Sequence, residues 1–220
     1  MTVKTLGIIM DGNRRWALAK GLPKTDGHKH GLDTLVKCME WCNESSIEHV
    51  VFYAFSTENW KRPKKEVTAL MDLFEYMMTE KRKDIIKEGV RVRFIGEKQK
   101  FSKKIQKMMF ELESETNKHT KTAWVCISYG GRAELVHAAA SISGKPTEKK
   151  IENSLWSADL PDLDLIIRTG GDHRLSNFML WKAAYAELYF IKTPWPGFTK
   201  AHFKKALDWY EKNVQVNNGK

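Results

Sequence analysis

The sequence of 220 residues has few cysteines and no long apolar run. Its three cysteines, Cys38, Cys42 and Cys126, are too few and odd in number for a disulfide framework, which favours a reducing compartment. The longest stretches free of Asp, Glu, Lys and Arg span ten residues, whereas a membrane-spanning helix needs about 20 apolar residues. We therefore expect a cytoplasmic protein without a transmembrane helix.

Several motifs of common enzyme classes are also missing. There is no Gly-x-Ser-x-Gly elbow, which argues against Ser-His-Asp hydrolysis, and no glycine-rich nucleotide-binding motif. Cys38 and Cys42 are spaced to share a helix face, but no second cysteine pair exists to complete a zinc site. We expect these two thiols to pack beside Leu35 and Trp41.

The charge is strongly one-sided. Lys and Arg number 37 against 27 Asp and Glu, which leaves a formal charge of +10. Such a field attracts phosphorylated ligands, nucleic acid or an anionic membrane surface. The lysine-rich segments 79–87 and 97–107 lack the regular aromatic residues of a nucleic-acid groove, so we interpret them as solvated helix faces and expect no nucleic-acid partner.

Short apolar runs alternate with longer segments of helical period, a pattern typical of strands joined by crossover helices. We predict an α/β fold, a single domain over residues 1–220 with a central, mostly parallel six-stranded sheet flanked by helices. The predicted strands are Leu6–Met10, His49–Phe55, Val90–Ile95, Ala123–Ser128, Asp164–Arg168 and Leu188–Phe190. The predicted helices are Gly31–Ser45, Glu66–Glu88, Ser102–Asn117, Glu134–Ser143, Asn177–Ala186 and Lys200–Asn213. We predict a flexible connection at residues 144–150 and fraying of the tail 217–220.

One predicted helix carries an apolar stripe rich in methionine. Leu70, Phe74, Met77 and Met78 share one side of the segment Glu66–Glu88. Such a stripe is usually part of the core, but methionine-rich walls also suit a flexible hydrocarbon ligand. Both interpretations stay open at this point.

Polar clusters follow three of the predicted strands. After the first strand come Asp11, Gly12, Asn13, Arg14 and Arg15, where a helix start would favour phosphate and a carboxylate could meet its Mg²⁺. The alternative makes Asp11 a helix cap and the two arginines surface charges. The sequence 53–63 then packs hydroxyls, an amide, a carboxylate and an arginine into one turn.

The third cluster places Arg168 at a strand end and adds Arg174 and Ser176 after a glycine pair, where their donors can converge on an anion. Each cluster alone could be an ordinary capped or salt-bridged turn. Three at three strand ends favour a diphosphate site. His28 and His30 flank Lys29 near two glycines, and the sequence does not decide between helix-start donors and metal ligands.

These clusters, in this order, resemble the cis-prenyltransferase family, whose best-known bacterial member is undecaprenyl diphosphate synthase. The resemblance runs from about Leu6 to Phe203. Its motifs are Met10–Trp16, Gly27–His28, Tyr53–Pro63, Tyr129–Arg132, Ile167–Phe178 and Tyr185–Phe190. It implies condensation of isopentenyl diphosphate onto an allylic diphosphate, usually farnesyl diphosphate, with new Z double bonds, Mg²⁺ and a homodimeric α/β fold.

The resemblance also implies roles for individual residues. Asp11 and Asn59 are the implied catalytic residues, and Asp11, His173 and Glu187 the implied metal ligands, with Glu187 reaching across the dimer. The implied substrate contacts are Gly12, Asn13, Arg14, Arg15, Trp16, Lys24, His28, Ser56, Thr57, Glu58, Trp60, Arg62, Arg168, Arg174, Leu175 and Ser176. Of these, Gly12–Arg15 surround the allylic diphosphate and Arg168, Arg174 and Ser176 grip isopentenyl diphosphate. Glu66 falls on a nearby carboxylate position, and Tyr129–Arg132 shape the site from beneath.

A growing hydrocarbon chain must be shielded from water, because burial of each CH₂ is favourable by about 0.8 kcal/mol. We therefore expect an apolar tunnel between sheet and helices, walled by the methionine-rich stripe with Ile9, Val51 and Phe55. The expected product is of undecaprenyl type, released during transient visits to the inner face of the membrane. The alternative is a catalytically silent partner subunit of a heteromeric synthase.

The sequence departs from the family pattern at several positions. Arg14 stands where glycine is frequent, Lys24 where arginine is common, and Asp172 where glutamate is frequent. The end of the chain, residues 209–220, lacks an arginine-rich, glycine-containing ending, and the connection 141–163 is short. These departures bear on dimer contacts and product length.

Overall fold

The computed structural model describes residues 2–217 and the side chains up to residue 214. Six strands form one parallel sheet in the order β3-β4-β2-β1-β5-β6. The strands are β1 (Thr5–Ile9), β2 (His49–Ser56), β3 (Arg91–Ile95), β4 (Thr122–Tyr129), β5 (Leu165–Arg168) and β6 (Glu187–Phe190). All six predicted strands are confirmed: β1 to β5 are short apolar runs that are largely buried, whereas the edge strand β6 has no fully buried residue.

The register of the sheet gathers the predicted polar clusters at one edge. Ile9 of β1 pairs with Arg168 of β5, so the residues that follow both strands start side by side. β1 is flanked by β2 on one side and by β5 on the other. In open parallel sheets ligands bind at such a switch point, outside the carboxyl ends of the strands.

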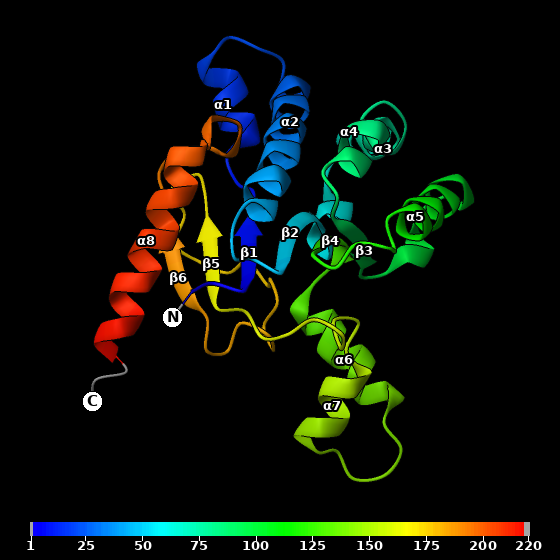
Figure 1. Cartoon of the computed structure of the whole chain (residues 1–220). Helices are drawn as coiled ribbons and strands as arrows, with labels where there is room; N and C mark the ends of the chain where they lie inside the picture. The colour runs from blue at the N-terminus through cyan, green and yellow to red at the C-terminus, as the bar shows by residue number, and fades with distance from the viewer. Residues whose placement is uncertain (1, 218–220) are drawn as a thin grey trace.

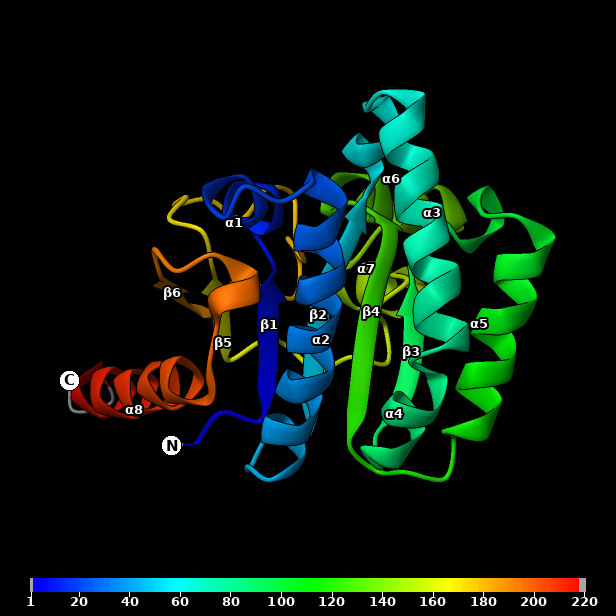
Figure 2. The ribbon, with the colours of Figure 1, turned by 90° about the horizontal axis from the view of Figure 1, so that it is seen from above.

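Helices cover both faces of this sheet (Figures 1 and 2). The α-helices are α1 (Asn13–Ala19), α2 (Lys24–Asn43), α3 (Lys64–Thr79), α4 (Arg82–Lys87), α5 (Lys103–Glu115), α6 (Gly131–Ser141), α7 (Glu148–Ser154) and α8 (Lys200–Asn217). Short 3-10 helices are η1 (Thr57–Lys61), η2 (Lys98–Lys100) and η3 (Trp195–Gly197). Figure 2 shows α2, α3, α4 and α5 in front of the sheet and α6 and α7 behind it. The α/β expectation is thus confirmed.

The sheet separates two apolar cores. The larger core joins one face of the strands to α2, α3, α5 and α8, with Phe52, Met78 and Phe203 among its members. The smaller core lies on the other face and includes Val51, Tyr129 and Phe178. Within the described residues no helix is both long and apolar enough to cross a bilayer.

The prediction of one long helix at Glu66–Glu88 is wrong, because the chain forms two helices, α3 and α4, with a break after Thr79. The Thr79 hydroxyl donates to the carbonyl of Glu75 at 2.9 Å. The amide of Lys81 bonds to the carbonyl of Tyr76 at 3.3 Å, one residue further back than in an α-helix. These local bonds end α3, although the apolar pattern continues.

The prediction of a helix at Asn177–Ala186 is also wrong. The segment forms turns instead, with positive φ angles of 66° at Asn177 and 43° at Met179. A left-handed residue interrupts the hydrogen-bond ladder of a right-handed helix. The apolar side chains at helical spacing, such as Phe178, are buried by turns against the smaller core.

Other boundaries shifted. α2 begins at Lys24, well before the predicted Gly31, and the unpredicted α1 precedes it. Half of the predicted flexible connection 144–150 belongs to the start of α7, which the Thr147 side chain caps by accepting a 3.3 Å bond from the Lys150 amide. Of the tail predicted to fray, Asn217 is the last residue of α8, and residues 218–220 lie outside the described part.

Candidate functional site

A cavity of about 630 Å³ opens beyond the carboxyl ends of β1, β2 and β5, between α2 and α3. Its polar lining includes Asp11, Asn13, His28, Ser56, Glu58, Asn59, Arg62, Arg168, Ser176 and Asn177. Its apolar lining includes Ile9, Met10, Leu32, Leu35, Leu70, Leu73, Phe74 and Met77. One cavity therefore joins a charged region to a hydrocarbon-like region.

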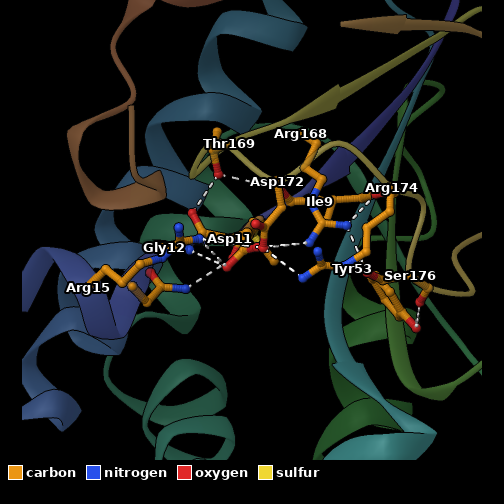
Figure 3. Close-up of polar contacts among 12 residues, drawn as sticks. Ile9, Asp11, Gly12, Arg15, Tyr53, Arg168, Thr169, Asp172, Arg174 and Ser176 are labelled. Carbon is orange, nitrogen blue, oxygen red and sulfur yellow. Dashed lines mark hydrogen bonds and ion pairs between the residues drawn. The ribbon is translucent and has the colours of Figure 1, made fainter. Parts of the chain in front are cut away.

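Asp11 and Arg168 form an ion pair in the charged region (Figure 3). Arg168 ends β5 and is 3% exposed, and its Nη2 lies 2.9 Å from Oδ2 of Asp11. Oδ1 of Asp11 accepts a 2.6 Å bond from the Gly12 amide and lies 3.3 Å from Nη2 of Arg15. Burial tends to raise the pKa of Asp11, but Arg168, Arg15 and the Gly12 amide hold it below its ordinary value. The carboxyl is therefore ionised.

The guanidinium of Arg168 also organises the loop after β5. Its Nη1 donates to Oγ of Ser176 at 2.8 Å and to the carbonyl of Arg174. Its Nε is buried without a hydrogen-bond partner among the described residues. The Arg174 side chain is 63% exposed and bonds to Asp172 at 2.8 Å. The structure therefore brings the Arg174 backbone and the Ser176 side chain to Arg168, whereas the Arg174 side chain bonds to Asp172, and the joint grip of the three residues on an anion stays a prediction.

Glu66 joins the first polar cluster to the second. Its Oε1 accepts hydrogen bonds from Nη1 of Arg14 at 3.2 Å and from Nη1 of Arg62 at 2.8 Å. His28 lies beside these charges, and its burial together with the charge of Arg62 lowers its pKa to about 4. The imidazole is therefore neutral near pH 7 and acts as a hydrogen-bond donor or acceptor, not as a cation.

The turn around η1 is held by hydrogen bonds at both ends. Oδ1 of Asn59 accepts a 3.0 Å bond from the Ser56 amide within a capping box. Oε1 of Glu58 accepts a 2.9 Å bond from Nδ2 of Asn177, whose Oδ1 accepts a 2.8 Å bond from the Arg132 amide. Burial tends to raise the pKa of Glu58, but this bond from Asn177 and local donors lower it. Asn177 thus ties the second cluster to α6.

Two glycines of α2 allow α1 to approach closely. A Cβ atom on Gly27 would overlap the Asn13 carbonyl, and one on Gly31 would overlap the Asn13 side chain. Gly12, just before α1, has a φ of 99°, a conformation that glycine adopts without strain. Asn13 donates to the Met10 carbonyl at 3.1 Å, while its Oδ1 is buried and lacks a partner in the described structure.

Several predicted contacts do not line this cavity. Trp16 packs on His30, with ring centroids 4.8 Å apart, and Lys24 is exposed at the start of α2. Nε1 of Trp60 donates to Ser128 at 2.9 Å. Thr57, next to Gly130, and Leu175, which packs against the smaller core, also lie outside the cavity lining, and so do Gly12, Arg14, Arg15 and Arg174.

The predicted apolar wall is only partly present at the cavity. Ile9, Leu70, Phe74 and Met77 line it, as predicted. The other three predicted wall residues, Val51, Phe55 and Met78, are buried within the two cores and do not line the cavity. Side-chain spacing identified the helix face but not how far along the helix the cavity extends.

Tyr53 and Asn177 are among the cavity residues that were not predicted as site residues from the sequence, although both lie within the quoted motifs. The hydroxyl of Tyr53 lies within hydrogen-bond distance of the carbonyls of Ser176, at 3.2 Å, and Tyr129, at 3.3 Å. Its burial raises the pKa of Tyr53, so it stays protonated. Asn177 is the second missed residue, and its only signal was its place in the third cluster.

Asp11 is the residue best suited to hold a hard cation. The described residues contain no group of three or more His, Cys, Asp or Glu side chains that could enclose a metal. A single ionised carboxylate facing a cavity nevertheless fits Mg²⁺, which keeps several waters and binds through one or two carboxylates plus substrate phosphates.

Of the other two predicted metal ligands, His173 lies at the same edge of the sheet as Asp11, whereas Glu187 lies at the opposite end of its strand. The His173 ring stacks on Phe190 with centroids 4.8 Å apart. Glu187 begins β6 and pairs with Leu165, at the amino end of β5, whereas Asp11 follows the carboxyl end of β1. Their roles as metal ligands stay predictions.

Comparison with protein families gives one match over nearly the whole chain. The family model described as "Putative undecaprenyl diphosphate synthase" matches residues 9–217. An isoprenyl transferase of Thermotoga maritima is 44% identical, over 97% of this chain and 96% of that protein. A trans,polycis-polyprenyl diphosphate synthase of Thermobifida fusca, specific for (2Z,6E)-farnesyl diphosphate, is 40% identical over 97% of this chain and 80% of that protein.

Solved structures give the same match in three dimensions. Lavandulyl diphosphate synthase from Lavandula x intermedia, in complex with dimethylallyl diphosphate, has a TM-score of 0.90 at 28% identity and covers 95% of each chain. A probable undecaprenyl diphosphate synthase from Campylobacter jejuni has a TM-score of 0.81 at 34% identity and covers 96% of each chain.

Proposed function

The chain belongs to the undecaprenyl diphosphate synthase family and is an isoprenyl transferase, and on this premise we propose that it condenses isopentenyl diphosphate onto an allylic diphosphate. Farnesyl diphosphate is the proposed primer. The proposed product is a Z-polyprenyl diphosphate of undecaprenyl type, a lipid-carrier precursor.

The observation that carries this proposal is the Asp11–Arg168 pair inside a cavity that continues between apolar helices. Arg168 is almost fully buried, and its charge is balanced by carboxylates on neighbouring loops. The oxygens of a substrate diphosphate can replace these carboxylates or bind Arg168 alongside them, because an arginine guanidinium can bind two phosphate oxygens at once. The apolar residues Leu70, Phe74 and Met77 then suit the prenyl tail.

The reaction separates an allylic carbon from its diphosphate and leaves negative charge on the oxygens. Arg15 and Arg168 hold positive charge beside Asp11 and stabilise the negative charge that develops on the diphosphate oxygens. When bound at Asp11, Mg²⁺ supplies Lewis-acid stabilisation of the diphosphate oxygens. Arg174 and Ser176, on the loop that Arg168 organises, are the proposed grip on isopentenyl diphosphate.

Asn59 has a restricted role in this proposal. The Oδ1 atom of Asn59 accepts a hydrogen bond from the backbone amide of Ser56. The Nδ2 group of the side chain therefore remains available as a donor. A neutral amide is also a poor base. We assign Asn59 the task of orienting a diphosphate oxygen, which takes the proton from the carbon next to the new bond.

The growing hydrocarbon chain is proposed to extend into a tunnel that continues from the cavity between α2 and α3. The proposed assembly is a homodimer, in which Glu187 approaches the neighbouring site. The proposed location is the cytoplasm, with transient contact at the inner face of the membrane when the greasy product leaves.

Incubation of the pure protein with farnesyl diphosphate, radiolabelled isopentenyl diphosphate and Mg²⁺ tests this function. We expect extended products, whose length is read by thin-layer chromatography after dephosphorylation. No extension would contradict catalysis and favour a silent partner subunit of a heteromeric synthase. A product much shorter than the undecaprenyl chain would support the proposed activity and contradict only the proposed product length.

A further inference from the structure

The outer surface of α1 and the turn into α2 exposes a leucine. Leu18, on α1, is 58% exposed, one of a few large apolar side chains that the described surface leaves in water. A leucine in this setting is either incidental or part of an interaction surface.

The surroundings of Leu18 are basic. Lys20, Lys24 and Lys29 are exposed, and none forms an ion pair with the residues that the structure describes. Asp26 is the single acidic residue between Gly12 and Leu32. We call Leu18 with these three lysines the α1–α2 rim.

Another exposed apolar side chain, Phe110, has a different electrostatic setting. Phe110 on α5 is 69% exposed, but the nearby Lys107 and Lys104 are paired with Glu111 and Glu75. On α8, Lys204 is paired with Asp208 within the same helix. The rim therefore combines an exposed leucine with three lysines that form no ion pair with the described residues, one of which, Lys20, lies over the Trp16 ring.

The rim also borders the substrate cavity. Asn13, the first residue of α1, lines the cavity, and so do His28 and Gly31 of α2. Both views place α1 beyond the carboxyl end of β1, the same end at which the cavity opens (Figures 1 and 2). A ligand that leaves through the polar end of the cavity passes next to this surface.

We propose that the α1–α2 rim docks on an anionic lipid bilayer, with Leu18 entering the interface and Lys20, Lys24 and Lys29 facing lipid phosphates. Amphipathic surfaces of this kind bind membranes through buried apolar area together with attraction to anionic lipid. Nucleic acid fits less well, because the Trp16 indole is covered by His30 and by Lys20, 4.9 Å above the ring, and is not free to stack on bases.

This inference rests on the proposed function, because it gives a hydrocarbon product a route into lipid. Docking at the rim brings α1, whose first residue Asn13 lines the cavity, to the bilayer. The same surface holds no part of the Asp11–Arg168 ion pair. Membrane binding is therefore measurable without catalysis.

Flotation with vesicles tests the docking. Vesicles of phosphatidylglycerol with phosphatidylcholine should bind the protein, and pure phosphatidylcholine should bind it weakly. We expect Leu18→Gln to weaken the partition coefficient about tenfold, the effect of losing one inserted leucine. Lys20→Glu with Lys29→Glu should weaken it at least as much, and salt of about 0.5 M should reduce binding through screening.

Matched controls place the effect on the rim. Phe110→Gln removes a larger exposed apolar side chain elsewhere, and Lys204→Glu with Lys205→Glu changes the net charge equally on α8; both should retain wild-type vesicle binding. Circular dichroism and gel filtration check the fold and the oligomeric state of each variant.

Three results would overturn the proposal: no binding of the wild-type protein to anionic vesicles, equal losses in the control variants, or a changed oligomeric state in Leu18→Gln that accounts for its loss. Tighter binding to a random single-stranded oligonucleotide than to vesicles would also contradict it. An inactive protein that still floats with vesicles through the rim would refute the proposed function alone.

Discussion

Nδ2 of Asn177 lies 2.9 Å from Oε1 of Glu58, although 119 residues separate the two in the chain. The side-chain Oδ1 of Asn177 accepts a hydrogen bond from the Arg132 amide, and its backbone carbonyl accepts one from the Gly131 amide at 2.7 Å. One side chain therefore connects the turn after β2, the loop after β5 and the start of α6. A residue in this place positions Glu58 without needing to touch substrate.

Asn177→Asp should separate this positioning role from backbone strain. Aspartate tolerates the left-handed φ of 66° and keeps an oxygen for Arg132, but it cannot donate to Glu58 and adds a like charge. We expect the pKa of Glu58 to rise and kcat/KM to fall about tenfold or more, at a stability cost of about 1–3 kcal/mol. NMR titration of Glu58 and steady-state kinetics check this. An unchanged Glu58 titration would contradict the role.

Asp11→Asn should nearly abolish turnover while leaving the circular dichroism spectrum intact. The amide retains the shape of the carboxyl but removes the charge that is proposed to hold Mg²⁺, and losses of about 10²-fold or more are typical for one such group. Asp172→Asn is the matched control, because this carboxylate also faces Arg168, at 3.5 Å. Equal effects of the two variants on turnover would remove the special role of Asp11.

Arg174 and Arg168 should respond differently to replacement by lysine. Arg174 is largely exposed, so Arg174→Lys is expected to raise KM for isopentenyl diphosphate with little change in Tm. Arg168 is buried and bonds to Asp11 and Ser176 through both ends of its fork. Arg168→Lys should therefore also lower the free energy of unfolding, by about 1–3 kcal/mol. Equal thermal shifts in the two variants would contradict this division.

Gly27→Ala should destabilise the contact between α1 and α2. A Cβ at this position meets the backbone of Asn13, which cannot rotate away, whereas a Cβ on Gly31 meets the Asn13 side chain. Both substitutions should cost about 1–3 kcal/mol. Denaturant unfolding of a double-mutant cycle with Asn13→Ala provides the measurement. We expect Asn13→Ala to relieve part of the Gly31→Ala cost and none of the Gly27→Ala cost.

His28 should make the folded state less stable in mild acid. Its pKa is lowered to about 4 in the folded protein, mainly by burial, compared with about 6.5 in an unfolded chain. Between these values the unfolded state binds more protons, so the free energy of unfolding falls as pH is lowered through this window. Linkage gives a loss on the order of 2 kcal/mol from about pH 7 to about pH 5. His28→Gln should remove that part of the slope in urea titrations; an unchanged slope would contradict the pKa shift.

The sequence by itself determined the sheet and the identity of the polar clusters. The strands are short apolar runs, and β1, β4 and β5 are buried on both faces, a signal contained in a few neighbouring residues. Asp11, Arg62 and Arg168 follow such runs, and in a parallel sheet the carboxyl ends of strands share one edge. The motifs that resemble the family therefore contain the polar residues that meet at this edge of the sheet.

Only the tertiary structure decided which of these side chains meet. The bonds of Asn177 and Tyr53 join segments far apart in the chain, so no local pattern contains them. The break after Thr79 and the turns at Asn177 depend on backbone bonds that compete with a favourable apolar period. Glu187 shows the same limit, because membership in a family motif did not reveal that its strand begins at the opposite end of the sheet from Asp11. Local composition specifies elements, whereas the register and packing of distant segments specify the site.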